Sequence, residues 1–373
     1  MKLIPTEYLV PGMTLEEDVI GENNQVIAGR ATILTDKLIS RLEFYNIEAV
    51  KISTESFSAP PASEAESAAA SDPTSIPMAP AGDGYSEKIK KSEEFQTFSA
   101  KLESATKDFS SKLSSMLEGD EPIDVDGLYT RIMDIIPENA TTLNIFDLIH
   151  NTRNHSDPIY AHSLNVALIS YVLGQWLGFS EEDVKILTVA GLLHDIGKSK
   201  VPEKILNKPG KLSSSEFEII KNHPIYGHNL LKGRSLDSRI LSATLQHHER
   251  CDGTGYPNAL KEKDIDTFSK VIAIADVYDA MTASRDFRSS TCPFKVVAIF
   301  EQEGLGKYDT HFIMTFLERI VLTYMHNNVR LSDGRVGEVV MINKMTLSRP
   351  IVKIGNDFVD LSTEKALTIE SIV

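Results

Sequence analysis

The sequence predicts a multi-domain protein, in which an all-α helical core lies between a small α+β module and a small β-rich unit. Three observations support this fold class. A stretch rich in Ser, Ala and Pro over 54–84 separates the first 53 residues from the remainder. Helical apolar periodicity then recurs over 123–327, with short polar breaks. From about residue 328, β-branched residues alternate with polar ones between glycine-containing turns, which is typical of strands.

The first two segments differ in their capacity to fold. Residues 1–53 are expected to form the α+β N-terminal module, because "EDVIGENNQVIAGRATI" places turn residues between short β-prone runs and "TDKLISRLEFYNI" carries apolar residues at helical spacing. Residues 54–84 contain almost nothing able to form a core. We therefore interpret them as a flexible linker.

An amphipathic helix is expected within 85–122, before the helical core begins. Its apolar stripe packs either on the following domain or against a second copy in a homodimer. The stripe comprises Phe95, Phe98, Leu102, Phe109, Leu113, Met116 and Leu117.

The remaining two segments are the helical core, 123–327, and the β-rich C-terminal unit, 328–373. In the core, "AHSLNVALISYVLGQWLG" presents its apolar residues on one helical face. In the C-terminal unit, "GND" at 355–357 is a hairpin candidate. We expect this unit to be a lid, a brace or a docking surface.

Composition limits the classes of partner. The 373 residues carry a net charge of −15, which argues against binding of a nucleic acid polymer, although local charges still permit a small anionic ligand. The two cysteines, Cys251 and Cys292, are expected to be reduced thiols. "MKLIPTEYLVPGMTLEEDV" lacks the unbroken apolar run of a signal peptide, and no apolar run has the length of a membrane span. These features predict a cytoplasmic protein without a membrane span.

Histidines and acids recur where apolar helical patterns end. Each residue alone is typical of a hydrogen-bonded core or capping residue. If all of these side chains were buried without polar partners, the cost would be large. Divalent metals would account for the whole set. Mixed imidazole and carboxylate ligands suit Fe, Mn or Zn better than Mg or Ca. The residues are His162, His194, Asp195, His223, His247, His248, Asp276 and Asp279.

The adjacent pair His194 and Asp195 follows the apolar run "LTVAGLL" and has a specific use in such a centre. The two oxygens of Asp195 can bridge two ions, while His194 supplies a nitrogen to one of them. Two metals bind a phosphodiester, lower the pKa of a water and stabilise the leaving oxygen. Lys198 lies one turn after His194, so its ammonium is expected to face the phosphate; the alternative is a solvated surface lysine.

Several motifs, joined in one order and spacing, resemble those of the HD-GYP family of HD-domain metal phosphohydrolases. "HSLNVA" (162–167) is similar to that family's first histidine block. The N-terminal "LVPGMTLEEDV" is also similar to segments attached to many bacterial members. The resemblance covers roughly 145–325. Its motifs are "HDIGK" (194–198), "HPIYG" (223–227), "HHERCDGTGYP" (247–257) and "ADVYDAMTASR" (275–285).

The resemblance implies an HD-domain helical core and hydrolysis of cyclic-di-GMP to pGpG or on to GMP, which lowers this bacterial second messenger. It implies a binuclear centre of two divalent ions, with Fe or Mn favoured and Zn, Ni or Co as alternatives. Catalytic roles fall on Asp195 and Lys198. The implied metal ligands are His162, His194, Asp195, His223, His247, His248 and Asp276.

Substrate contacts are expected from a second set of residues. The family's signature loop lies beside the substrate, and it is also the expected docking point of a GGDEF-type diguanylate cyclase. Asp279 is expected to hold Lys198 or a water, or to lie on the helix surface. The complete set is Lys198, Gly255, Tyr256, Pro257, Asp279, Arg285 and Arg288.

Two departures from the family pattern affect these expectations. Pro158 stands where three-metal members carry a glutamate, and proline cannot ligate, so we expect two metals, with His248 as a weaker ligand or as support for another ligand. "RDFR" at 285–288 replaces the family's "RPY" and a base. Its two arginines can still clamp a phosphate or guanine, but Asp286 can tilt that clamp.

Three functions therefore remain open at this level. The first is a cyclic-di-GMP phosphodiesterase. The second is a cyclic-dinucleotide receptor or protein-docking module with little catalytic power. The third is a phosphodiesterase for another cyclic dinucleotide, such as cyclic GMP-AMP. A degenerate copy would be expected to lose His194, Asp195 or the pair His247 and His248, and the sequence retains all of them, which favours an enzyme over a receptor.

Overall fold

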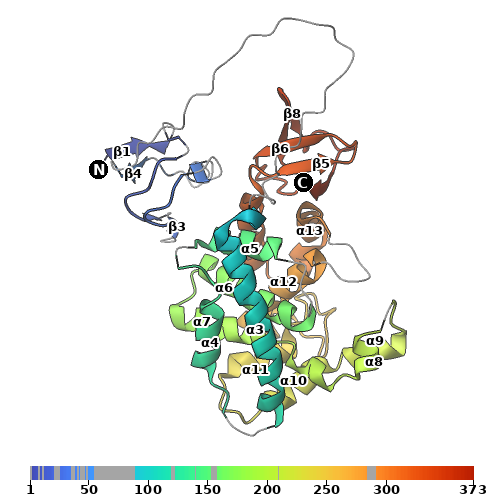
Figure 1. Ribbon diagram of the computed structural model, residues 1–373. Helices are drawn as coiled ribbons and strands as arrows, with labels where there is room; N and C mark the ends of the chain where they lie inside the picture. Colours follow the sequence, from blue (N-terminus) through green and yellow to red (C-terminus); the bar gives the residue numbers. More distant parts are fainter. Residues whose placement is uncertain are drawn as a thin grey trace, which may run out of the picture. The chain divides into compact units, whose positions relative to one another are not determined.

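The chain divides into two compact units in the computed structural model (Figure 1), one within Met1–Lys88 and one over Ile89–Ile372. Each unit has a hydrophobic core of its own. The structure describes residues 2–6, 9–10, 12–20, 26–34, 38–39, 42, 47, 49–53, 89–118, 122–138, 140–152, 158–208, 210–283 and 291–373.

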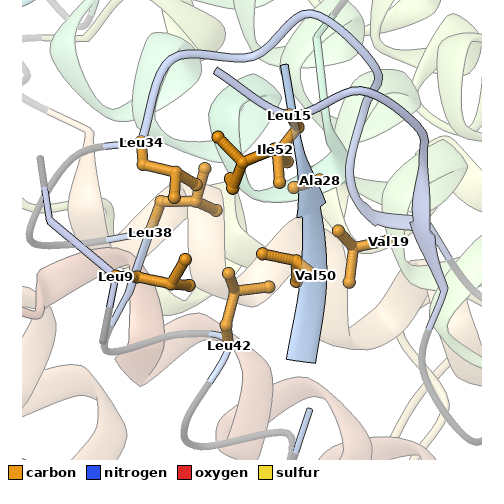
Figure 2. Packing of buried hydrophobic residues seen from close by; sticks show 9 residues of the cluster. All are labelled: Leu9, Leu15, Val19, Ala28, Leu34, Leu38, Leu42, Val50 and Ile52. Carbon is orange, nitrogen blue, oxygen red and sulfur yellow. The ribbon is translucent and has the colours of Figure 1, made fainter. Parts of the chain in front are cut away.

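The N-terminal unit contains two antiparallel strand pairs. Strand β1 (Lys2–Pro5) pairs with β4 (Ala49–Ile52), and β2 (Val19–Ile20) pairs with β3 (Val26–Ala28). Aliphatic side chains from these strands and from neighbouring segments pack on one another (Figure 2). Its α+β character as a whole stays a prediction. The core residues are Leu9, Leu15, Val19, Ala28, Leu34, Leu38, Leu42, Val50 and Ile52.

The second unit is predominantly helical between residues 93 and 324. Its elements are α3 (Glu93–Glu118), α4 (Val125–Met133), α5 (Thr142–Asn151), α6 (Pro158–Trp176), α7 (Glu181–Leu193), η2 (Ile196–Lys200), α8 (Glu203–Leu206), α9 (Ser214–Ile220), α10 (His223–Leu231), α11 (Ser238–Gln246), η3 (Glu262–Asp264), α12 (Thr267–Thr282), α13 (Pro293–Ile299), η4 (Phe300–Gly304), α14 (Leu305–Lys307), α15 (Thr310–Ile320) and η5 (Val321–Tyr324).

Polar residues fix where these helices begin. Ser180 caps α7 by accepting from the backbone N–H of Asp183, and Asp266 caps α12 in the same way. Ser213 and Glu216 form a reciprocal capping box at the start of α9. Such caps satisfy the N–H groups that have no partner within the helix, so each helix starts at a defined residue.

The helical core is assembled around α6, α7, α11 and α12, which pack on one another. Helix α12 is buried over most of its length, and an aromatic cluster of Phe146, Trp176, Tyr278 and Phe316 fills the space beside it. Helix α3 packs along α6 within the same unit, through the stripe that includes Phe98, Leu102 and Phe109.

A five-stranded antiparallel sheet completes the second unit. Its strands are β5 (Asn328–Leu331), β6 (Val336–Met341), β7 (Ile351–Ile354), β8 (Asp357–Asp360) and β9 (Ile369–Ile372), in the order β8-β7-β6-β5-β9. The predicted hairpin at 355–357 joins β7 and β8, with Ile354 opposite Asp357. The predicted helical core and β-rich C-terminal unit are therefore confirmed. Within the described residues, every helix is too short or too polar to cross a bilayer.

Candidate metal centre

The predicted ligands lie on five separate helices or on the turns that follow them. His162 projects from α6, and His194 with Asp195 follows the end of α7. His223 is the first residue of α10, whereas His247 and His248 follow α11 and Asp276 lies within α12. The structure brings all seven side chains together. Residues from distant parts of the chain therefore lie close together, as predicted.

Close helix packing depends on one glycine of the "HDIGK" motif. A Cβ atom on Gly197 would lie 2.0 Å from the carbonyl oxygen of His223 and 2.4 Å from the backbone nitrogen of Gly227. Only glycine lets η2 approach α10 this closely. The approach carries the Asp195 carboxylate to the His223 imidazole, with Oδ1 and Nε2 3.1 Å apart.

The two oxygens of Asp195 face different pairs of histidines. Oδ2 lies 3.2 Å from Nε2 of His194 and 3.7 Å from Nε2 of His162. Oδ1 lies 3.1 Å from Nε2 of His223 and 3.7 Å from Nε2 of His247. A carboxylate that divides its oxygens in this way can bridge two adjacent cation positions.

Asp276 adds a second carboxylate beside the first of these positions. Its Oδ1 lies 3.1 Å from Nε2 of His162 and 4.0 Å from Nε2 of His194, and its Oδ2 lies 3.6 Å from Nδ1 of His248. Donor atoms of Asp195, His223, His247 and His248 form one compact group, and those of His162, His194 and Asp195 form another. Asp195 belongs to both groups.

Hydrogen bonds on the outer edges of the imidazoles determine which nitrogen points inward. Nδ1 of His194 donates to the carbonyl of Gly191 at 2.7 Å, and Nδ1 of His223 donates to Ile220 at 2.8 Å. Nδ1 of His247 donates to Thr244 at 3.0 Å. With the proton on Nδ1, each Nε2 presents a lone pair to the centre, as metal ligation requires.

The resulting arrangement brings acceptor atoms together without enough donors. Nε2 of His223 and Nε2 of His247 are 3.1 Å apart. Among the described residues, Nε2 of His194 and Oδ1 of Asp195 are buried and make no hydrogen bond. Buried lone pairs facing one another are unfavourable unless a cation lies between them. The donor set therefore fits divalent metal ions.

The electrostatics of the site agree with this donor set. Burial opposes ionisation of Asp195, but the Lys198 ammonium and His194 outweigh it and hold the pKa of Asp195 well below its usual range. Burial lowers the pKa of His247 to about 4, and burial together with His247 holds the pKa of His248 well below its usual range. These imidazoles are neutral near pH 7, which is the form that binds metal.

Lys198 pairs directly with Asp195, donating from Nζ to Oδ2. Its side chain is 22% exposed, whereas that of Asp195 is only 2% exposed. The ammonium therefore lies at the accessible edge of the centre. A cation here balances the buried carboxylate and is available to a bound anion.

Asp279 occupies a different position from the substrate contact that the sequence predicted. Its Oδ2 accepts a hydrogen bond from Nδ1 of His162 at 2.7 Å, and its Oδ1 accepts from Nδ2 of Asn165 at 3.2 Å. The residue is 1% exposed. Asp279 accepts from the outer nitrogen of His162 and so orients that imidazole. Backbone carbonyls orient His194, His223 and His247 in the same way.

The signature loop lies against the centre through Tyr256. The ring of Tyr256 stacks on that of His248, with centroids 4.6 Å apart and planes inclined by 29°. Gly255 turns the chain tightly, since a Cβ atom there would lie 2.4 Å from the Cα atom of Glu249. Pro257 is partly buried in the same loop.

Sequence reasoning missed the role of Glu249. Its carboxylate is buried and accepts hydrogen bonds from the backbone N–H groups of Asn258 at 2.7 Å and Leu260 at 2.9 Å. These bonds hold the loop onto the turn that carries both histidines. The available signal was an acid directly after a histidine pair.

Two further predictions concern the arginine clamp and Pro158. Arg285, Asp286 and Arg288 lie outside the described residues, so the predicted clamp stays a prediction. Pro158 is the first residue of α6. A proline is favourable at that position, because its missing N–H would have no partner within the helix.

The comparisons with known proteins agree with this geometry. Residues 146–311 match the HD domain family, and this region contains every ligand candidate described above. The helical unit thus carries a region that matches the HD domain family, and the resemblance of this region to the HD-GYP family is confirmed.

Curated relatives give the resemblance more detail. A cyclic di-GMP phosphodiesterase of Pseudomonas aeruginosa is 36% identical over 196 residues, which are 52% of this chain and 47% of that protein. A cyclic di-GMP phosphodiesterase response regulator of Xanthomonas campestris is 38% identical, over 36% of this chain and 37% of its own length. A 3′3′-cGAMP-specific phosphodiesterase of Vibrio cholerae is 40% identical, over 40% of this chain and 35% of its own length. The chain thus covers less than half of each relative.

Proposed function

We propose that this protein is a metal-dependent phosphodiesterase that hydrolyses cyclic-di-GMP to pGpG or GMP. The observation that carries the proposal is the division of the Asp195 oxygens between two groups of imidazoles. A bridging carboxylate between two nitrogen-rich positions is typical of binuclear hydrolytic centres. The relatives named as cyclic di-GMP phosphodiesterases support the choice of substrate.

The residues fall into two ligand groups joined by Asp195. His162, His194 and Asp276 would hold one ion with one oxygen of Asp195, and His223 and His247 would hold the other with the second oxygen. His248 lies between them, with Nδ1 toward Asp276. Fe or Mn suits these ligands, with Zn, Ni or Co as alternatives. When bound, the ions would supply Lewis acidity and an activated water for phosphodiester cleavage.

The protein's own groups bind and orient the substrate. Lys198 contributes an ammonium to the phosphate that undergoes cleavage and stabilises the negative charge that grows there. Tyr256, stacked on His248, forms one wall beside the centre, and Gly255 with Pro257 shapes the loop that carries it. Arg285 and Arg288 are proposed to clamp a second phosphate or a base. Asp279 and Glu249 act indirectly: Asp279 orients His162, and Glu249 holds the signature loop.

A second substrate is favoured by a specific comparison. The relative from Vibrio cholerae that is 40% identical is named a 3′3′-cGAMP-specific phosphodiesterase. A cyclic dinucleotide with one adenine and one guanine therefore belongs in any substrate test. Docking of a GGDEF-type cyclase on the signature loop and formation of a homodimer stay predictions.

The decisive experiment compares the wild-type protein with an Asp195→Ala variant. Both are purified anaerobically, analysed for metal and incubated with cyclic-di-GMP or 3′3′-cGAMP before chromatography. We expect the wild type to hold about two equivalents of metal and to release pGpG or GMP, and the variant to lose both properties. Asp333→Ala, in the β5–β6 turn, is the control. Binding without turnover in the reduced, metal-loaded wild type would favour a receptor.

A further inference from the structure

Helix α3 contributes to a cavity that reaches the candidate metal centre. The cavity has a volume of about 60 Å³. It is lined by Asp195 and Lys198 together with Phe109 of α3 and Tyr160 of α6. Helix α3 precedes the region that matches the HD domain family, which begins at residue 146. A segment outside the matched domain therefore forms part of the wall beside the centre.

A second, larger cavity adjoins the first. Its volume is about 500 Å³, which lies within the range of roughly 300–1,000 Å³ typical of sites for small organic ligands. Phe109 and Leu192 line both cavities, so the two spaces meet at these side chains. The larger cavity lies among α3, α4, α6 and α7.

The lining of the larger cavity indicates a ligand with polar edges. Four charged residues, Lys101, Asp108, Arg131 and Asp134, line it together with aliphatic side chains. All four are exposed, so they can meet the polar edges of a ligand while the aliphatic side chains meet its apolar face. A heterocycle with hydrogen-bonding edges and an apolar face matches both kinds of lining.

Phe109 and Tyr160 supply the flat surfaces that such a heterocycle requires. Their ring centroids are 5.9 Å apart and their planes are inclined by 86°, an edge-to-face contact. In that arrangement, each ring keeps at least one face that the other does not cover. Aromatic faces bind nucleobases by stacking, and they do so for every base because each base has a π-face.

We propose that Phe109 and Tyr160 form a nucleobase subsite, which receives one purine of the cyclic dinucleotide whose phosphate is bound at Asp195 and Lys198. The proposal rests on the proposed function, because the position of the phosphate fixes which part of the substrate reaches the aromatic pair. The purine lies against Phe109 where the two cavities meet, and its edges face the charged lining. This assigns α3 a role in substrate recognition besides packing.

The test uses Phe109→Leu, because leucine keeps the apolar bulk and removes the aromatic face. We expect KM for cyclic-di-GMP to rise about tenfold, since stacking is worth roughly 1–3 kcal/mol per base and 1.4 kcal/mol is a factor of ten. Tyr160→Leu is expected to act in the same direction. Hydrolysis of methyl 4-nitrophenyl phosphate, which has no nucleobase, should be unchanged in both variants, as should metal content.

Phe358→Leu is the matched control, because Phe358 is 67% exposed on β8 and far from both cavities in sequence. An unchanged KM for cyclic-di-GMP in Phe109→Leu and Tyr160→Leu, with an active wild type, would overturn the subsite and leave the proposed function intact. Equal losses with both substrates would also overturn it, because they indicate a packing defect. A metal-loaded wild type that hydrolyses neither substrate would reject the proposed function itself.

Discussion

The conservative substitution Asp279→Asn tests whether the centre depends on a residue that does not touch the metals. The carboxylate accepts from His162 at 2.7 Å and from Asn165 at 3.2 Å, so both of its oxygens face donors. An amide must turn its NH₂ group toward one of them, which brings two donors together. The substitution therefore weakens the orientation of His162 with almost no change in volume.

The expected effect is confined to one of the two proposed ions. Loss of a carboxylate that supports a metal-bound histidine lowers metal affinity by about 10- to 100-fold, equivalent to about 1.4–2.7 kcal/mol. His223 and His247 take their Nδ1 support from backbone carbonyls, which the substitution does not alter. We therefore expect one Mn²⁺ equivalent to bind more weakly and the other to bind as in the wild type.

Equilibrium dialysis against stepwise concentrations of free Mn²⁺, followed by metal analysis, separates the two affinities. Fluorescence of Trp176, the single tryptophan, reports whether the helical unit remains folded. Asp333→Asn, which alters a surface ion pair with Arg335, is the matched control. If the folded Asp279→Asn variant binds both Mn²⁺ equivalents with wild-type affinity, the assignment of Asp279 as the group that orients His162 is refuted.

Three other substitutions address the loop and the lysine. Lys198→Met is expected to lower kcat/KM for the cyclic dinucleotide by about 100-fold with no loss of metal, and wild-type kinetics would contradict its role at the phosphate. Glu249→Gln keeps at most one neutral hydrogen bond and turns its NH₂ group toward the other backbone N–H, so unfolding in urea should become easier by about 1–3 kcal/mol and KM should rise; an unaltered denaturation midpoint would count against the loop clamp. Gly255→Ala forces a Cβ atom to within 2.4 Å of the Glu249 Cα atom, and we expect a loss of about 3 kcal/mol or more, measured as a lower Tm; a Tm equal to that of the wild type would show that the loop relaxes freely.

The sequence was sufficient to predict which histidines and acids come together, because they recur where apolar helical patterns end and lie in motifs that resemble those of the HD-GYP family. It was insufficient to predict which nitrogen or oxygen each ligand presents. Asp276 and Asp279 are three residues apart on one helical face, yet one contacts Nε2 of His162 and the other contacts Nδ1. An imidazole carries its two nitrogens on different edges, so neighbouring acids on one helix can serve opposite sides of the same ring.

Long-range packing explains the other differences. Residues 109 and 160 belong to separate helices, and only the packing of α3 along α6 brings Phe109 to the cavity beside Lys198. The same holds for Glu249, whose partners Asn258 and Leu260 depend on how the signature loop folds back. The apolar stripe of α3 predicted a packing face, but a stripe does not specify its partner.

The metal-free protein should lose stability as the pH rises from about 6.5 to 9. Burial opposes protonation of His162, but hydrogen bonds to Asp276 and Asp279 outweigh it and raise the pKa of His162 to about 9. In the unfolded chain the pKa is about 6.5. The stabilisation is therefore fully present below pH 6.5 and is lost as the pH rises through about 9. A difference of about 2.5 pKa values corresponds to about 3 kcal/mol.

Metal binding should remove this dependence, because a ligated His162 is neutral at Nε2 throughout the same pH window. Urea unfolding followed by Trp176 fluorescence at pH 6.5, 7.5 and 9 measures the effect with and without Mn²⁺. His162→Gln should abolish the dependence of the metal-free protein, and His311→Gln, at an exposed position on α15, should preserve it. Equal pH dependence in metal-free wild type and His162→Gln would mean that His162 does not hold the proton, and with it that the two acids do not act on this ring as their distances indicate.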